Sequence, residues 1–331
     1  MKNIFKITVA AAAMSASLMA AEVMAAEYTI KLAHVMGPFH DTSMAADKFA
    51  ELVDEKSDGR IKIEHYPGGA LGSDMESYQS AQMGMIDIGG GSFANLVSIT
   101  RAFEVFHLPY IFRSRDEAHR ALDSKKVTNA IDGELKKVGL KWLMTYEYGF
   151  RNINTVDKKV ESIGDMSGLK LRTSRSPTEM AAIEAFGGSA TAIDWGEVYN
   201  ALSFGIVDGE AQPFGTMVSA RHHEIINEHL ENSFQFYAWV ALVSEKKWNS
   251  YPGWVQTILT EAASESESFH REIWAQEKEK SKQAYLESGG TITTLTDDEL
   301  GPWIKAGKST WDKSGVTKDI IDLVQSEVKG N

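Results

Sequence analysis

Strand-like and helix-like segments alternate along the first 150 residues, and this alternation constrains the fold more than any other feature. Alternating or continuous apolar runs, typical of strands, occur at 28–35, 60–66, 85–88, 103–108 and 140–146. Apolar residues at helical spacing follow the cap at 41–43 and continue at 73–83 and 116–137. Strands that alternate with helices form a largely parallel sheet covered by helices. We therefore expect an α/β fold.

The same pattern starts again near residue 148, which indicates a second unit. A strand at 169–173 is followed by a helix that Ser176 and Pro177 open, and a strand-like run at 234–244 returns the chain to the first unit. The helical stretch at 252–287 is about 50 Å long at 1.5 Å per residue, longer than one lobe is wide. We predict that it braces two lobes. No internal sequence repeat is evident.

The N-terminus has the pattern of a secretory signal peptide. Lys2 and Lys6 precede an apolar run at 7–21, which is too short to cross a bilayer comfortably. Small residues precede a predicted cleavage site near Ala26, so residues 1–26 are predicted to be removed. The chain has no cysteine, which excludes disulfides and a lipid-anchoring cysteine. We expect a soluble protein in the periplasm.

Length and charge limit the architecture and the partners. About 300 mature residues exceed what one hydrophobic core usually holds, which favours two lobes. The net charge of −12 becomes −13 on maturation, because the removed segment carries two lysines and one glutamate. Such an acidic chain is not expected to bind nucleic acid through its general field. A site for an anion must therefore be built locally from specific cations.

Several short motifs resemble enzyme sites but fail on spacing. The glycine-rich run at 89–94 lacks the acidic residue that a dinucleotide site requires about 20 positions later. Its glycines are better explained by the close approach of a ligand or helix to the backbone. The GKS run at 307–309 lacks the correctly spaced glycine of a phosphate loop, and His223-Glu224 lacks the second histidine of a zinc site. We expect no catalytic residue, metal or cofactor.

Arg172 is the strongest single candidate for a ligand contact. It lies near the end of the predicted strand at 169–173, and open α/β sheets bind ligands at the carboxyl edge of their strands. The planar guanidinium suits a carboxylate held by two parallel hydrogen bonds. A surface or interlobe salt bridge is the alternative for an arginine at this position.

Four sequence blocks around Arg172, and two earlier ones, occur in an order that resembles a known family. They are GFRN at 149–152, GLKLRT at 168–173, DWGEVYNAL at 194–202 and VDGEAQP at 207–213, with YPGGALG at 66–72 and LPYIF at 108–112. Together they resemble the DctP-like solute-binding proteins of tripartite ATP-independent periplasmic (TRAP) transporters, over nearly the whole mature chain. The resemblance implies a two-lobed periplasmic binding protein fold with a ligand cleft between the lobes. We predict that lobe I consists of 27–148 and 238–277, and lobe II of 149–237 and 278–331.

The resemblance also assigns roles to residues. It implies that Arg172 pairs with the ligand carboxylate, that Arg151 supports the same anion, and that Trp195 lies against the ligand. The family's D-G-Q-E-N-P block reads DGEAQP here, so that Gln212 replaces an asparagine and Ala211 replaces a glutamate. Less secure wall residues are Phe93, Ser92, His34 and Tyr237. Trp195 and Tyr237 can alternatively be core residues, and His34 a loop or cap histidine.

The implied function is capture of a small organic acid, a carboxylate, for uptake by transport rather than catalysis. The partners implied are the integral membrane subunits of a TRAP transporter, and nothing requires more than a monomer. A monocarboxylate, a sugar acid, an aromatic acid or a dicarboxylate all remain open as ligands. The alternatives are an exported enzyme acting on an organic acid and a ligand-sensing protein of the same fold.

Overall fold

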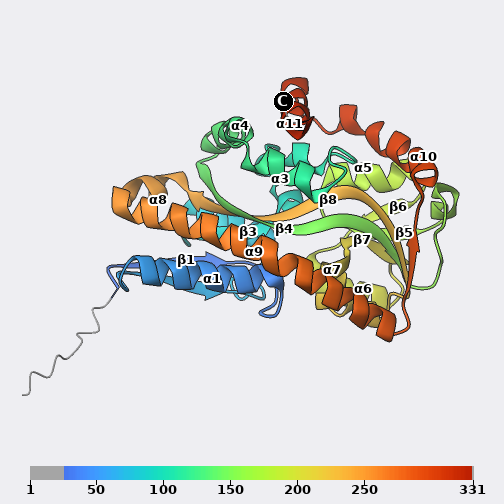
Figure 1. Ribbon diagram of the computed structural model, residues 1–331, viewed down its shortest axis with the longest axis horizontal. Coiled ribbons are helices and arrows are strands. Elements are labelled where there is room, and N and C mark those ends of the chain that lie inside the picture. Colours follow the sequence, from blue (N-terminus) through green and yellow to red (C-terminus); the bar gives the residue numbers. More distant parts are fainter. Residues whose placement is uncertain (1–25, 330–331) are drawn as a thin grey trace, which may run out of the picture.

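The structure is a computed structural model that describes residues 26–329, and one mixed sheet runs through it (Figure 1). The strands are β1 (Tyr28–Ala33), β2 (Ile61–Tyr66), β3 (Ile88–Ser92), β4 (Leu140–Thr155), β5 (Lys170–Thr173), β6 (Ser189–Ala192), β7 (Gly209–Pro213), β8 (Glu228–Ser244) and β9 (Thr291–Thr294). Their order is β2-β1-β3-β8-β4-β7-β5-β6, and β9 pairs with β8. The predicted signal peptide, residues 1–26, lies outside the described residues apart from Ala26.

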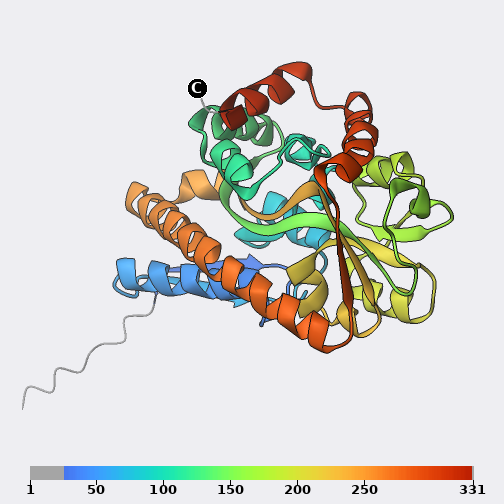
Figure 2. The same ribbon diagram turned by 45° about the vertical axis from the view of Figure 1, so that its right-hand side comes forward.

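Helices cover both faces of this sheet (Figures 1 and 2). They are α1 (Asp41–Lys56), α2 (Asp74–Met83), α3 (Arg115–Asp123), α4 (Lys125–Lys136), α5 (Pro177–Ala185), α6 (Val198–Ser203), α7 (Phe214–Ser219), α8 (Glu245–Ser250), α9 (Gly253–Glu287), α10 (Asp297–Lys308) and α11 (Lys318–Lys329). One face carries α1, α6, α7 and α9, and the other carries α3, α4, α5 and α10. This is the α/β layering that the sequence pattern predicts.

Two long strands connect the lobes. The outer strands pair in parallel, β1 with β2 and β3, and β5 with β6 and β7. Between them β4 and β8 are antiparallel to each other and to their neighbours β7 and β3. The register of β4 shifts between Glu147 and Gly149. Gly149 has φ of 102°, and a Cβ there would lie 2.7 Å from the Trp274 ring of α9. The sheet is therefore mixed at its centre, because the chain crosses from lobe to lobe there.

The strand order repeats about the centre of the sheet. The sequence β2-β1-β3-β8 on one side corresponds to β6-β5-β7-β4 on the other. The same kind of hydrogen bond occurs just before β3 in one lobe and just before β7 in the other. Asp87 accepts one from the Lys31 N–H at 2.9 Å, and Asp208 accepts one from the Lys170 N–H at 2.8 Å. Each lobe is thus built on the same plan, although the sequence shows no obvious repeat.

Local predictions fail where context overrides the apolar pattern. The run at 103–108 is a 3₁₀ turn, η2 (Glu104–His107), rather than a strand, and its residues pack in an aromatic cluster. The predicted helix at 116–137 is two helices, because Ser124 ends α3 and caps α4 by accepting a hydrogen bond from the Val127 N–H. The strand predicted at 85–88 begins only at Ile88 and continues through glycines.

Three consecutive glycines make β3 a close-packed strand. A Cβ on Gly89 would lie 2.4 Å from the Ser77 carbonyl oxygen of α2, and one on Gly90 would lie 2.1 Å from the Trp239 ring. Glycine has a low strand propensity, so composition alone hides this strand. The expected approach of a helix to the glycine backbone is confirmed.

The predicted bracing helix is α9, which spans 35 residues and contacts α1 in one lobe and α7 in the other. The C-terminal α11 packs on α3 and α4, helices of the predicted lobe I, although the lobe boundaries placed residues 278–331 in lobe II. The boundaries themselves stay a prediction. Among residues 26–329, no helix is both long and apolar enough to cross a membrane.

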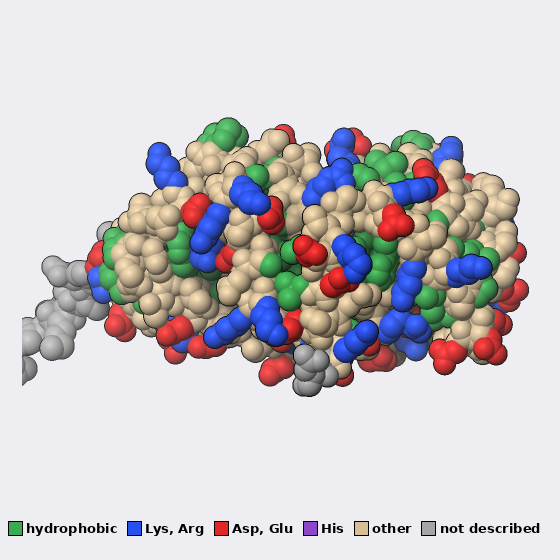
Figure 3. Space-filling model, turned by 90° about the horizontal axis from the view of Figure 1, so that it is seen from above, with side chains coloured by type: hydrophobic (Ala, Val, Ile, Leu, Met, Phe, Trp, Pro, Cys, Tyr) green, Lys and Arg blue, Asp and Glu red, His purple; other side chains and the backbone are tan. Residues whose placement is uncertain are grey.

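The surface seen from above Figure 1 carries both signs of charge. On this face Lys and Arg side chains alternate with Asp and Glu side chains, and the hydrophobic groups are scattered between them (Figure 3). A mixed surface of this kind is typical of a soluble protein.

Candidate functional site between the lobes

Arg172 lies on β5 and is 3% exposed. Its Nε and Nη2 donate to the carbonyl oxygen of Ile193, at 3.0 and 2.8 Å. The remaining nitrogen, Nη1, is buried and has no hydrogen-bond partner among residues 26–329. Leaving a buried charged donor unpaired costs more than about 1–3 kcal/mol. The guanidinium is therefore fixed in direction by the backbone, with one nitrogen left for a group outside the chain.

The alternative interpretation of Arg172, as a salt bridge, is not what the structure shows. Within the described part of the chain, no carboxylate lies within ion-pair distance of it. The nearby Arg175 does form such a pair, donating through two nitrogens to Asp194 at 2.8 and 2.9 Å at the surface. Burial lowers the pKa of the Arg172 guanidinium, and the surrounding carboxylates Glu179 and Glu210 oppose this shift.

Arg151 lies on β4 and is fully buried. Its guanidinium carbon is 3.5 Å from the centre of the Tyr237 ring. Nη1 pairs with Glu179 of α5 at 3.0 Å and also donates to the Ala211 carbonyl oxygen. Nε and Nη2 are buried without a hydrogen-bond partner in the described chain. Arg151 is thus neutralised on one side and open on the other.

Gln212 and Trp195 lie beside Arg172. β7 pairs with β5 so that Glu210 stands next to Arg172, and Gln212, two residues further, lies on the same face. The Gln212 Oε1 is buried and unpaired within residues 26–329. Trp195 is half-buried at the start of η4 (Trp195–Glu197), with its ring centre 5.5 Å from the guanidinium carbon of Arg172. It packs on apolar residues of both lobes.

A second group of unpaired polar atoms lies in lobe I. Asp74, the first residue of α2, accepts hydrogen bonds through Oδ2 from the Ser92 N–H at 3.0 Å and from Asn95 at 2.9 Å. Its Oδ1 and the Ser92 hydroxyl are buried and have no partner among the described residues. Burial raises the pKa of Asp74, and the charge of Arg172 opposes the shift. The charge of Arg172 therefore acts on Asp74 across the lobes.

Tyr237 of β8 joins the two walls. Burial raises the pKa of its phenol; the charge of Arg151 opposes this shift, and the charges of Glu179 and Asp74 add to it. The groups that converge here are called the interlobe polar cluster, which consists of Asp74, Ser92, Arg151, Arg172, Gln212 and Tyr237. Buried polar atoms normally have partners, so this concentration of unpaired ones indicates a place for a polar ligand or water.

Two predicted wall residues lie outside this cluster. His34 accepts a hydrogen bond through Nδ1 from the Met36 N–H at 3.1 Å, and its Nε2 lies 2.7 Å from Nε2 of His65. Both nitrogens are thus engaged within lobe I. Phe93 stacks on Phe103 at 5.0 Å within the aromatic core. Their contact with a ligand stays a prediction.

Sequence reasoning missed Asp74 and Glu179. Asp74 follows Ser73, which forms a capping box with Glu76 at the start of α2. In the sequence this pattern indicates an ordinary helix start and does not show that the Asp74 side chain is buried. Glu179 lies in the first turn of α5 and reads as a favourable helix-end charge. Only the tertiary fold shows that both carboxylates are buried, at 6% and 0% exposure.

The lobes also touch directly. Glu104 of η2 accepts hydrogen bonds from the hydroxyl of Ser176, at 3.4 Å, and from that of Thr178, both at the start of α5. Burial raises the pKa of Glu104. This contact and the packing of Trp195 join the two lobes directly.

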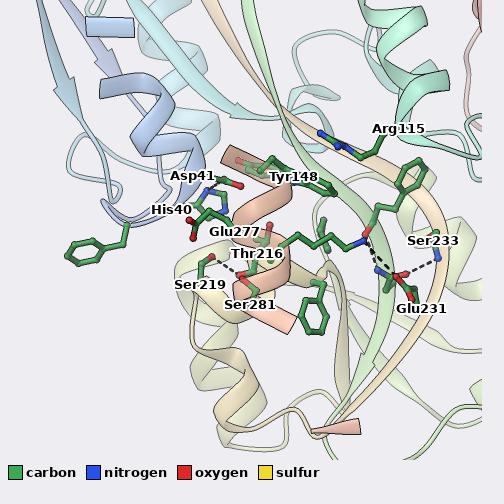
Figure 4. Close-up of a pocket in the computed structure, with 18 residues that line it drawn as sticks. His40, Asp41, Arg115, Tyr148, Thr216, Ser219, Glu231, Ser233, Glu277 and Ser281 are labelled. Atoms are coloured by element: carbon green, nitrogen blue, oxygen red, sulfur yellow. Dashed lines mark hydrogen bonds and ion pairs between the residues drawn. The ribbon is translucent and has the colours of Figure 1, made fainter. Parts of the chain in front are cut away.

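A separate hollow lies on the α9 side of the connecting strands (Figure 4). It has a volume of about 150 Å³ and contains neither Arg172 nor Gln212. Its lining includes His40, Asp41, Arg115, Tyr148, Thr216, Glu231 and Lys278. Arg115 is already paired through two nitrogens with Glu147, so the hollow offers no open guanidinium. In residues 26–329 no group of three or more His, Asp or Glu side chains is placed to hold a metal ion.

Comparison with known proteins decides the family. Residues 32–318 match the model of the family described as "Bacterial extracellular solute-binding protein, family 7", also called DctP. The chain belongs to this family. The predicted membership is confirmed, and with it the class of solute-binding protein.

Relatives and solved structures agree with this assignment. The C4-dicarboxylate-binding periplasmic protein DctP of Rhodobacter capsulatus is 28% identical over 304 residues, 91% of this chain and 90% of its own. The 2,3-diketo-L-gulonate-binding periplasmic protein YiaO of Escherichia coli is 27% identical over 268 residues, 79% of this chain and 81% of its own. The TRAP periplasmic solute binding protein of Sulfurospirillum deleyianum, solved with bound succinate, is 26% identical with a TM-score of 0.84, covering 91% of this chain and 99% of that one. The predicted two-lobed α/β fold is confirmed by this match.

Proposed function

We propose that this solute-binding protein captures a small organic acid between its lobes, with the ligand carboxylate on Arg172, and delivers it to the membrane subunits of a TRAP transporter. The observation that carries the proposal is the buried Nη1 of Arg172, which is unpaired within residues 26–329 although the rest of the guanidinium is fixed on Ile193. A carboxylate oxygen accepts a short, charge-assisted hydrogen bond from such a guanidinium nitrogen. The relatives named above bind organic acids.

The energy available from this cluster is sufficient for capture. Hydrogen bonds to charged groups contribute about 1.5–3 kcal/mol each. Contacts from Arg172, Arg151 and Gln212 would together supply most of the roughly −8 kcal/mol that a micromolar dissociation constant requires. Trp195 would exclude water from these contacts and pack on the organic part of the ligand.

Closure of the lobes would couple capture to delivery. Trp195 and Glu104 make contacts across the lobes that an open form would lose. A ligand that bridges the two walls therefore favours the closed form, since it binds that form better. We propose a monomer that acts in the periplasm after cleavage near Ala26 and presents a surface made by both lobes to the membrane subunits.

An exported enzyme acting on an organic acid is the other candidate, and Asp74 is the observation that favours it. A buried carboxyl group with a raised pKa beside a ligand is a common feature of a general base. The family consists of substrate-binding proteins, and Asp74 is accounted for as a wall of the binding site. Recovery of unchanged ligand after incubation with the protein would support binding, and conversion of the ligand would support the enzyme.

A thermal-shift screen tests the proposal. The mature protein from Glu27 onward is mixed with organic acids, sugar acids, sulfonates and neutral compounds, because a bound ligand raises the melting temperature. Arg172→Ala should weaken binding of the stabilising acid by at least about tenfold, the value of one charged hydrogen bond. Arg175→Ala is the matched control, since Arg175 is an exposed arginine nearby in lobe II. Stabilisation by neutral or cationic compounds alone, or equal binding by Arg172→Ala, would contradict the proposal.

A further inference from the structure

His107 is a buried histidine beside the interlobe polar cluster. It is the last residue of η2 and is 0% exposed. Neither of its ring nitrogens has a hydrogen-bond partner among residues 26–329. Because buried polar atoms normally have partners, these two nitrogens indicate a contact with a group outside the chain.

The fold places His107 where the parallel strands of lobe I end. β3 ends at Ser92, and η2 lies beside β8 beyond this point. Gln235 of β8 donates from Nε2 to the His107 carbonyl oxygen. The Tyr110 N–H donates to the Phe234 carbonyl oxygen at 2.8 Å. The backbone of this segment is thus fixed at the carboxyl edge of the sheet, where open α/β sheets bind ligands.

The His107 ring packs on aromatic residues near Arg151. Its centre lies 5.4 Å from the centre of the Tyr237 ring and 5.9 Å from that of Phe93. The guanidinium carbon of Arg151 is 3.5 Å from the same Tyr237 ring. Burial lowers the pKa of His107 well below its usual range, and the charge of Arg151 lowers it further. The imidazole is therefore neutral at physiological pH, with one N–H to donate and one nitrogen to accept.

A second buried histidine differs from His107 in one respect. His270 of α9 is 1% exposed and stacks on Tyr146 at 4.9 Å, and its nitrogens also lack hydrogen bonds in the described chain. Its Nε2 lies 3.7 Å from Asp41 Oδ1, within ion-pair distance. Among the carboxylates of residues 26–329, none lies that close to His107. A carboxylate of the chain therefore accounts for His270 but not for His107.

Arg151 determines which kind of atom can enter beside His107. Its Nε and Nη2 are buried donors that lack a partner in the part of the chain that the structure describes. A guanidinium has donors only and no acceptor. An oxygen that accepts from Arg151 can also accept from the neutral imidazole N–H, whereas a donor group would find no acceptor on Arg151. The expected occupant is thus an oxygen with several lone pairs, such as that of a carboxylate.

We propose that His107 is a ligand-binding residue, which donates a hydrogen bond from its neutral ring to an oxygen of the bound acid on the Arg151 side of the interlobe polar cluster. This inference rests on the proposed function, because it takes the acid to lie between the lobes. His107 directly precedes the LPYIF block at 108–112 and lies outside it. It adds affinity for an anion without adding a third positive charge.

Calorimetric titration of His107 variants tests this. The probes are succinate, D-glucuronate and the acid that gives the largest thermal shift in the screen. His107→Phe keeps a ring and removes both nitrogens, so it should weaken binding by at least about tenfold. His107→Gln keeps a donor and an acceptor and should stay within about threefold of the unaltered protein. His270→Phe is the matched control, a buried histidine outside the cluster, and should change affinity by less than about twofold.

The outcomes separate this inference from the proposed function. If His107→Phe binds as tightly as the unaltered protein while Arg172→Ala does not, His107 is no ligand contact and the carboxylate site stands. Equal losses in His107→Gln and His107→Phe would assign the effect to packing and contradict the hydrogen bond. If no acid binds, or Arg172→Ala binds equally well, the proposed function fails as well.

A crystal structure of the unaltered protein with the bound acid decides the contact even if a variant does not fold. A ring nitrogen of His107 within about 3.2 Å of a ligand oxygen supports the inference. A ring that bonds only to water or to protein groups overturns it.

Discussion

The buried pair of Arg151 and Glu179 predicts that one substitution will lower the stability of the protein and raise its affinity for the ligand. Both side chains are fully buried, 3.0 Å apart, and Glu179 also accepts from the N–H and hydroxyl of Ser174. Glu179→Gln keeps the shape but leaves the Arg151 charge without its partner. Breaking such a pair costs about 3–5 kcal/mol. We expect the free energy of unfolding to fall by about this amount.

The same change should strengthen ligand binding. The freed guanidinium regains a counter-charge only when a carboxylate enters the interlobe polar cluster. Affinity for the stabilising acid should therefore rise by at least about tenfold, equivalent to about 1.4 kcal/mol, while the ligand-free protein is less stable. Urea denaturation with and without the acid measures the free energy of unfolding, and calorimetric titration measures the affinity for the acid.

Two further variants make the test specific. Glu184→Gln removes an exposed carboxylate from the same helix and should change stability by no more than about 0.5 kcal/mol. The double variant Arg151→Met, Glu179→Leu removes both charges and should be more stable than Glu179→Gln, since apolar replacement of a buried pair is often neutral. A loss below about 1 kcal/mol in Glu179→Gln, or a double variant no more stable than it, would refute the reasoning.

Two other predictions concern packing and pH. Gly90→Ala should destabilise the fold by about 1–3 kcal/mol, because its Cβ would meet the Trp239 ring at 2.1 Å. Gly133→Ala, which has open space around it in α4, should stabilise the fold by about 0.5–1 kcal/mol. Equal unfolding midpoints for the two variants would contradict this prediction. Burial raises the pKa of Glu267 from 4.5 to about 7. The folded state then holds this proton more tightly than the unfolded state, so stability should fall by about 2–3 kcal/mol as pH rises from 4.5 to 7. Glu267→Gln should remove that part of the slope in urea titrations at several pH values.

The sequence predicted what local patterns determine. The α/β alternation, the bracing helix and the position of Arg172 near a strand end follow from periodicity, capping and residue type. The central pairing of β4 with β8 does not, because the partners lie far apart in the chain and each reads as an ordinary strand. The strand β3 was misplaced since its glycines have low strand propensity, and only the contacts of α2 and Trp239 explain them.

In the candidate site, too, the residues marked by local sequence patterns were predicted and those positioned by distant contacts were not. Arg172 and Gln212 were found from their sequence blocks, and the structure places both in the interlobe polar cluster. Asp74 was missed because a helix-start aspartate is usually solvated, and its burial depends on Gly91 of another element. His34 was placed at the wall by alignment, but a contact with His65, a residue of the neighbouring strand, engages its ring.

The position of β8 has a consequence for how the chain acquires its structure. This strand lies between β3 and β4 and completes the sheet of lobe I, yet it comes from the last third of the chain. Lobe I therefore cannot close its sheet while only the first half has been synthesised, and contacts this distant in sequence form slowly. The sheet of lobe I can form only after β8, which ends at Ser244, has been made. A fragment that stops before β8 would leave β3 with an open edge.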